Sequence, residues 1–169
     1  PLVATSASLL ARDVVLALVV EHPRHGWALQ RELAPGSTLG RAWTLSRQLV
    51  YRAIDNLEQE GLVRRSRPVE GEGADKVVLS PTAAGRRRTK VWLSEPVGHV
   101  RDVRTELLVK LILRERAGLD NRGFVGLQHD RLAPVLGLLS SNKSNDPVDR
   151  WRAESARATM RFLEGLARA

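Results

Sequence analysis

The chain has 169 residues, 43% of them apolar and 27% charged, which is typical of one soluble globular domain with an extension and too apolar for a disordered chain. It contains no cysteine, which excludes disulfides, thiolate zinc sites and cysteine nucleophiles, and its longest apolar run, Val14–Val20, is far shorter than the roughly 20 residues that span a bilayer. With no signal-peptide pattern at the start we expect a cytoplasmic protein, and the net charge of +8, from 27 Lys and Arg against 19 Asp and Glu, points to a polyanionic partner without locating it.

The chain opens with a predicted helix that should be buried, because it is apolar around most of its circumference. Ser8 is a suitable N-cap for this helix. His22-Pro23 should end it, since the residue before a proline avoids helical backbone angles. A short second helix is predicted over 26–33, with Pro35-Gly36 as its stop, and a polar stretch follows over 37–44.

The third predicted helix has the clearest start signal in the chain. Ser46 is a good N-cap, Leu45 before it can pack against Val50 one turn on, and Gly61 suits the position after the helix end. From Arg47 onward, one face is apolar and the opposite face is polar at helical spacing. The apolar face holds Val50, Ala53, Ile54 and Leu57, and the polar face holds Gln48, Tyr51, Arg52 and Asp55.

A β-hairpin is predicted next. Its strands are expected over 62–69 and 76–79, joined by a glycine-rich turn over 70–75. Ser80-Pro81 should then open a fourth helix, with the serine as N-cap and the proline as the first helical residue. This helix is expected to run to about Leu93.

Beyond Pro96 the sequence predicts helices only. They cover 101–116, 122–139 with a bend or break at Pro134, and 147–169, and a loop over 140–146 separates the last two. The last helix carries a stripe of mainly apolar residues at helical spacing, namely Val148, Trp151, Ser155, Ala158, Phe162 and Leu166.

The order of helix, helix, helix, hairpin and helix in the first part of the chain is that of a winged helix-turn-helix domain. The predicted fold is therefore mostly α with a small β-hairpin wing. We expect a winged helix-turn-helix DNA-binding domain over 1–95 and a C-terminal α-helical dimerisation region over 96–169.

The third helix is the predicted DNA reader, because its polar face suits a major groove while its apolar face packs on the first helix. A serine hydroxyl and free N–H groups at a helix start suit a phosphate. Arginine pairs with guanine and glutamine with adenine in the major groove, and basic residues flank the hairpin. The candidate DNA-binding residues are Ser46, Arg47, Gln48, Tyr51, Arg52, Arg64, Arg65, Arg67 and Lys76.

Several segments resemble those of PadR-type transcriptional regulators. The segment 45–63 looks like their recognition helix, and His25-Gly26-Trp27-Ala28-Leu29 resembles the opening of their second helix. Leu79-Ser80-Pro81-Thr82-Ala83-Ala84-Gly85 is similar to the joint that follows their wing. Trp92 and the run 106–111 also match in residue type, so that the resemblance covers about residues 8–115 and, loosely, the final helix.

The resemblance implies a homodimer with C-terminal helices exchanged or packed between subunits, and repression of a nearby promoter. It also implies that a small molecule, hydrophobic or aromatic, releases the DNA. Two recognition helices about 34–36 Å apart would read a pseudo-palindromic duplex. The wing departs from the family, where it is often basic and aromatic, because its tip carries Glu70, Glu72 and Asp75. An acidic tip repels phosphates, which leaves Lys76 and the arginines at the strand bases to contact DNA.

Other interpretations compete with specific DNA binding. The polar face of the third helix could be an ordinary solvated face, and the run 86–90 is better explained that way. A winged helix that binds a protein would bind DNA weakly and without sequence preference, as would a non-specific nucleic-acid-binding protein. An RNA-associated role is disfavoured, because the chain has only two Phe and one Tyr for base stacking.

Trp92 and Trp151 are candidate effector-binding residues, although tryptophan also commonly fills dimer interfaces. No cofactor and no metal site are expected, since His22 and His25 lack further ligands nearby and His99 and His129 stand alone. No phosphate-binding glycine loop, nucleophile elbow or metalloprotease motif is present. We therefore expect no enzymatic activity.

Overall fold

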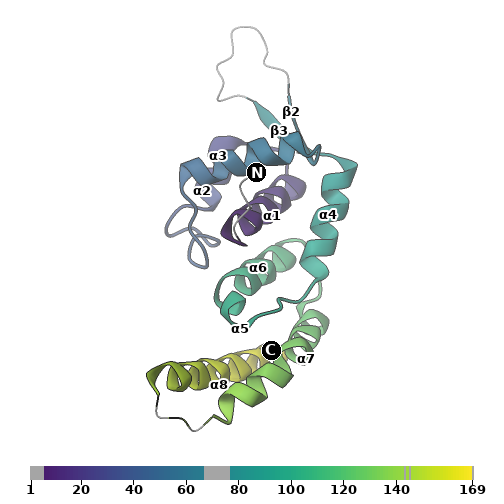
Figure 1. The fold of residues 1–169 in the computed structure, drawn as a ribbon. Helices are drawn as coiled ribbons and strands as arrows, with labels where there is room; N and C mark the ends of the chain where they lie inside the picture. Colours follow the sequence, from purple (N-terminus) through teal and green to yellow (C-terminus); the bar gives the residue numbers. More distant parts are fainter. Residues whose placement is uncertain (1–5, 67–76, 143, 145, 169) are drawn as a thin grey trace. The chain divides into compact units, whose positions relative to one another are not determined.

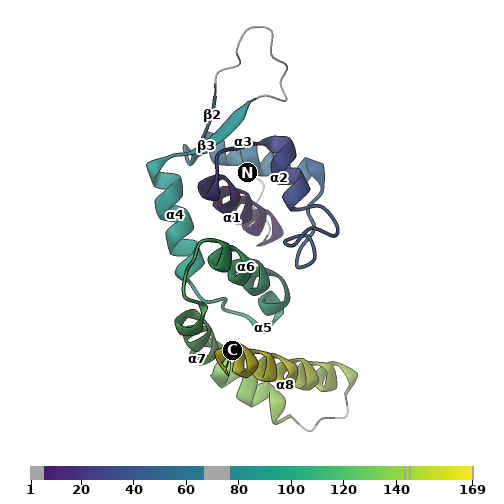
Figure 2. The same ribbon diagram turned by 180° about the vertical axis from the view of Figure 1, so that it is seen from behind.

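The computed structural model describes residues 6–66, 77–142, 144 and 146–168, and the chain divides into two compact units, 1–94 and 95–169. The fold is mostly helical, with one small antiparallel sheet in the first unit (Figures 1 and 2). The predicted fold class is thus confirmed. The predicted wing residues from 67 to 76, including Arg67, Lys76 and the acidic tip, lie outside the described residues.

The first unit has four helices and three strands among its described residues. In chain order they are α1 (Ser6–Glu21), β1 (Arg24–His25), α2 (Gly26–Glu32), α3 (Arg47–Gln59), β2 (Val63–Arg65), β3 (Val78–Pro81) and α4 (Ala83–Ser94). The helix α1 is central, because it contacts α3, α4 and β3. Its residues from Val14 to Val19 are at most 5% exposed, which agrees with the prediction of a buried helix.

One helix start in this unit differs from the prediction, and one strand was not predicted. The helix α1 begins at Ser6, so Ser8 lies inside its first turn and is not the N-cap, because alanine at position 7 favours helix. The sheet also has a third strand that the sequence did not indicate. The two residues of β1 pair with Val78 and Leu79 of β3, and a strand this short carries no alternating pattern.

The joint between β3 and α4 also differs from the prediction. Ser80 and Pro81 belong to β3, where Pro81 lies opposite Val63, so Ser80 does not cap α4. The cap is Thr82, whose Oγ1 accepts the N–H of Gly85 at 3.1 Å and donates to the carbonyl of Gly61 at 2.8 Å. One hydroxyl therefore connects the chain just after α3 to the first turn of α4.

Helices are the regular secondary structure of the second unit among its described residues. It contains α5 (Val100–Asp102), the π-helical turn η2 (Val103–Leu107), α6 (Leu108–Arg116), α7 (Asn121–Ser140) and α8 (Pro147–Arg168). The last two helices lie side by side, as both ribbon views show. The predicted helix over 101–116 is thus present, but its N-terminal part includes a π turn.

The core of this unit is formed where α7, α8 and η2 meet. Its buried residues are Val97, Val103, Leu107, Phe124, Leu132, Leu136, Ala156 and Leu163. Gln128 is fully buried in α7, and its side chain accepts the N–H of Val97 at 2.7 Å and donates to the carbonyl of the same residue at 3.1 Å. Both polar ends of this amide are satisfied, so the buried glutamine anchors the segment that precedes α5.

The N-terminus of α7 is capped by a side chain, and its middle contains a proline. Asp120 caps the helix by accepting the N–H groups of Arg122 and Gly123 at 2.9 and 3.2 Å, and these bonds lower the pKa of its carboxyl. The helix continues through Pro134, so of the predicted bend or break the break is absent. Because Pro134 is exposed, water can solvate the carbonyl that has lost its helical partner.

Candidate nucleic-acid interface

The helix α3 packs on the core through the apolar face that the sequence predicts. Val50, Ala53, Ile54 and Leu57 are all at most 3% exposed, and the helix packs on α1 and α2. Its opposite face is solvent-exposed at Arg47, Gln48 and Arg52. The elements that pack against α3 therefore leave Arg47, Gln48 and Arg52 exposed to solvent.

The start of α3 is organised by Ser46 and Arg47. The Oγ of Ser46 accepts the N–H of Leu49 at 3.3 Å, so the predicted N-cap is confirmed and its hydroxyl proton is available to donate. The guanidinium of Arg47 lies over the ring of Tyr51, 5.5 Å from its centroid. This cation–π contact fixes the orientation of the exposed guanidinium, which comes from the helical turn before Tyr51.

Tyr51 is less accessible than its neighbours on the polar face. The side chain is half-buried, and its ring lies against Gly26 at the start of α2. A Cβ at position 26 would lie 3.1 Å from Cε1 of the ring, so a larger residue there would displace the tyrosine. Tyr51 thus links α2 to α3 and orients Arg47, and only part of it faces solvent.

The two arginines of β2 have different environments. Arg64 is exposed and forms no ion pair with any residue in the described part of the chain. Arg65 instead binds two carboxylates of α3, with Nη1 at 2.6 Å from Glu58 and Nη2 at 2.5 Å from Asp55. Of this predicted pair, only Arg64 projects a free cation.

One feature beside α3 was missed in the sequence. The indole of Trp27, 43% exposed at the start of α2, stacks with the ring of His25 at 6.1 Å, and Arg31 lies over it at 5.6 Å. The rings are nearly parallel, at 10°. The close spacing of His25, Trp27 and Arg31 in the sequence is the signal that could have indicated this exposed cation–aromatic stack.

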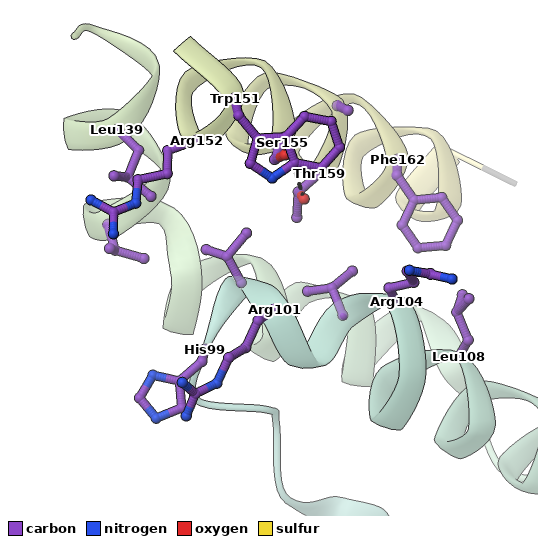
Figure 3. Close-up of a pocket in the computed structure, with 14 residues that line it drawn as sticks. His99, Arg101, Arg104, Leu108, Leu139, Trp151, Arg152, Ser155, Thr159 and Phe162 are labelled. Atoms are coloured by element: carbon purple, nitrogen blue, oxygen red, sulfur yellow. Dashed lines mark hydrogen bonds between the residues drawn. The ribbon is translucent and has the colours of Figure 1, made fainter. Parts of the chain in front are cut away.

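The second unit contains a separate cavity of about 760 Å³, shown in Figure 3. Trp151, Ser155, Thr159 and Phe162 project from α8 on one side, and Arg104 lies on the other. The second predicted effector residue, Trp92, is only 5% exposed on α4 and does not line this cavity. Trp92 and Trp151 belong to different units, and of the two only Trp151 lines this cavity.

Among the described residues, no group of three or more His, Cys, Asp or Glu is arranged to hold a metal ion. Within the same residues, no helix is both long enough and apolar enough to cross a bilayer.

Replacing Ser46 with alanine should lower the free energy of unfolding by about 0.5–2 kcal/mol, because the first turn of α3 loses its side-chain cap. Urea unfolding followed by circular dichroism measures the change. The control is Ser46→Asn, which retains a capping oxygen and should unfold close to the wild type. Equal stability of the alanine variant and the wild type would contradict the role of this cap.

Residues 15–91 match the model described as the transcriptional regulator PadR-like family. A curated relative, the probable transcriptional regulator Rv1176c of Mycobacterium tuberculosis, is 26% identical over 103 residues, which are 61% of this chain and 53% of the relative. The chain thus spans about half the length of this relative.

Two solved structures of Bacillus subtilis PadR are also similar to this chain. The complex with operator DNA has a TM-score of 0.47 and 17% identity, and the match covers 92% of this chain and 94% of that one. The complex with p-coumaric acid has a TM-score of 0.46 and 16% identity, covering 94% of this chain and 96% of that one.

Proposed function

We propose that the chain is a cytoplasmic, dimeric repressor that binds DNA through α3, from the premise that residues 15–91 match the PadR-like family of transcriptional regulators. The family is one of regulators, so the proposed role is regulatory and not enzymatic. The observation that carries the proposal is the division of α3. Its apolar face is buried in the first unit, and its polar face is exposed.

The polar face of α3 has the chemistry that a major groove requires. Arg47 and Arg52 carry exposed guanidinium groups, and Gln48 presents an exposed amide between them. Arginine binds guanine through two hydrogen bonds and glutamine binds adenine in the same way. The hydroxyl of Ser46 and the side chain of Arg64 are suited to phosphates, which fix the position of the helix on the duplex.

Dimerisation is proposed through the apolar stripe of α8. The buried face of this helix is formed by Ala153, Ala156 and Leu163, while Trp151 on the stripe is 73% exposed and Phe162 is 37% exposed. Exposed large apolar residues along one helix are typical of a surface that a partner covers. In a dimer, two copies of α3 would read two halves of a pseudo-palindromic operator.

Replacing Trp151 with alanine should raise the dimer dissociation constant by about tenfold, because tryptophan is enriched among the residues that dominate interface energies. Sedimentation equilibrium over a range of concentrations measures this constant. The matched control is Trp27→Ala, which removes an exposed tryptophan from the first unit and should leave association unchanged. An unchanged dissociation constant for the Trp151 variant would contradict the proposed interface.

A small hydrophobic or aromatic effector is proposed for the cavity beside α8. The wall carries Trp151 and Phe162 together with aliphatic side chains such as Val103 and Leu108. Binding there would release DNA by favouring a spacing of the two recognition helices that the operator does not accept. A compound that binds this cavity tightly and leaves operator affinity unchanged would contradict the mechanism.

The test of the proposed function is fluorescence anisotropy with the duplex upstream of the protein's own gene and a scrambled duplex, each at two salt concentrations. A regulator should prefer the upstream duplex, and the preference should persist at physiological salt. Equal binding of both duplexes that disappears with salt would leave only a basic surface. That result would favour a winged helix that serves a protein partner.

A further inference from the structure

Arg65 at the end of β2 forms a forked contact with α3. Its two terminal nitrogens reach different carboxylates, Nη1 to Glu58 at 2.6 Å and Nη2 to Asp55 at 2.5 Å. The acceptors are three residues apart and therefore neighbours on one side of the helix. A planar guanidinium can bridge two such carboxylates at once, which a lysine ammonium does with much less geometric definition.

The direction of the Arg65 side chain follows from the strand. Val63 is buried, and alternation along a strand puts Arg65 on the same side as Val63 and Arg64 on the opposite side. Arg65 therefore points back over α3, whereas Arg64 points away from the carboxylates. Two adjacent arginines with the same charge thus face different surroundings, one paired and one free.

The charge balance of α3 gives this contact a consequence for DNA. The helix carries two cations, Arg47 and Arg52, near its start, and two carboxylates, Asp55 and Glu58, in its second half. Carboxylates beside a groove are repelled by phosphates unless a cation compensates for them. Arg65 supplies that cation and, in the same contact, holds the β2 strand at a defined place along the helix.

We propose that Arg65 is a positioning residue, which holds the wing strand against α3 through Asp55 and Glu58 and thereby sets where the two elements meet the duplex. This inference rests on the proposed DNA-binding function. It reassigns Arg65 from the phosphate contacts expected from sequence to a contact within the protein. Arg64 remains the phosphate-binding candidate of this strand.

The test compares wild type, Arg65→Lys, Arg65→Ala and the matched control Arg64→Ala by anisotropy with the upstream and scrambled duplexes across a salt series. Arg65→Lys keeps the charge but cannot form the fork, so its preference for the upstream duplex should fall at least about threefold. Arg64→Ala should weaken binding to both duplexes alike. It should also reduce the slope of log affinity against log salt concentration by about 0.9, which is the effect of one lost phosphate contact.

A fourth variant, Asp55→Asn/Glu58→Gln, separates the positioning role of Arg65 from an effect of charge alone. It removes two negative charges and should bind the scrambled duplex more tightly, yet it should lose preference for the upstream duplex as the Arg65 variants do. Adding Arg65→Ala to it should cause no further loss of preference, because residues that act as one unit are not additive. Circular dichroism should show folded protein for all variants, since these ion pairs are partly exposed.

The outcomes separate the two levels of the proposal. If Arg65→Lys behaves as wild type and Arg65→Ala lowers the salt slope by about 0.9, Arg65 is a phosphate contact and the inference is overturned while the proposed function stands. If the wild type itself does not prefer the upstream duplex, the proposed function fails, and the inference fails with it.

Discussion

Arg47→Ala is expected to weaken binding to the operator duplex by about 1–3 kcal/mol, which is roughly 5-fold to 150-fold, if this arginine reads a base edge. The residue is exposed at the first position of α3, where the helix start approaches a groove in winged helices. Its contact with the Tyr51 ring reduces the freedom that binding would remove. Anisotropy titrations with operator and scrambled duplexes measure both affinities.

The control for this experiment is Arg87→Ala, which removes another exposed arginine, from α4. This control should change the two affinities by much less, because α4 is not part of the proposed interface. A loss on the operator alone assigns Arg47 to base recognition. An equal loss on both duplexes makes it a phosphate contact, and no loss on either would remove it from the interface.

Gly85→Ala is expected to destabilise the first unit by about 1–3 kcal/mol or more, the usual cost of forcing an atom into filled space. A glycine-to-alanine change inside a helix ordinarily stabilises, so the predicted sign is reversed. The reason is local, because a Cβ at position 85 would lie 2.2 Å from the carbonyl oxygen of Leu62. That oxygen is a backbone atom and accepts the N–H of Thr82 at 3.0 Å, so it cannot move without disturbing the joint.

The matched control is Gly126→Ala in α7, where a Cβ would meet no atom within 4 Å. This variant should be more stable than wild type by about 0.5–1 kcal/mol, since alanine is the better helix former. Urea unfolding followed by circular dichroism measures both variants. A Gly85→Ala protein as stable as wild type would show that α4 and the chain before β2 are less closely packed than the structure indicates.

The helix α3 could be predicted nearly to the residue because every local signal agreed. Ser46 caps it, four apolar residues at helical spacing seat it, and Gly61 follows it with a φ of +68°, a conformation that favours glycine. The strand β1 could not be predicted, because two residues carry no periodicity and pair only through tertiary structure. The cap of α4 was misplaced by two residues, since Ser80-Pro81 has the composition of a helix start yet lies in a strand.

The candidate site was only partly accessible to sequence reasoning. Composition and helical spacing identified the residues of the polar face of α3, but not which of them are free. That Arg65 is held by Asp55 and Glu58 depends on the register of β2 against α3, which no local pattern contains. Similarly, the sequence does not distinguish the environments of Trp92 and Trp151, yet Trp92 is 5% exposed and Trp151 is 73% exposed.

The joint at Thr82 also bears on how such a domain diversifies. The amide of Thr82 bonds to Leu62 at 3.0 Å, and farther along the hairpin the amide of Ser66 bonds to the carbonyl of Val78 at 2.8 Å. Each of these hydrogen bonds joins a residue that precedes the segment 67–76 to a residue that follows it. Insertions, deletions or grafted sequences in that segment therefore need not disturb the packing of α3. The segment can therefore be exchanged, in evolution or by design, while α3 and the elements that pack against it stay the same.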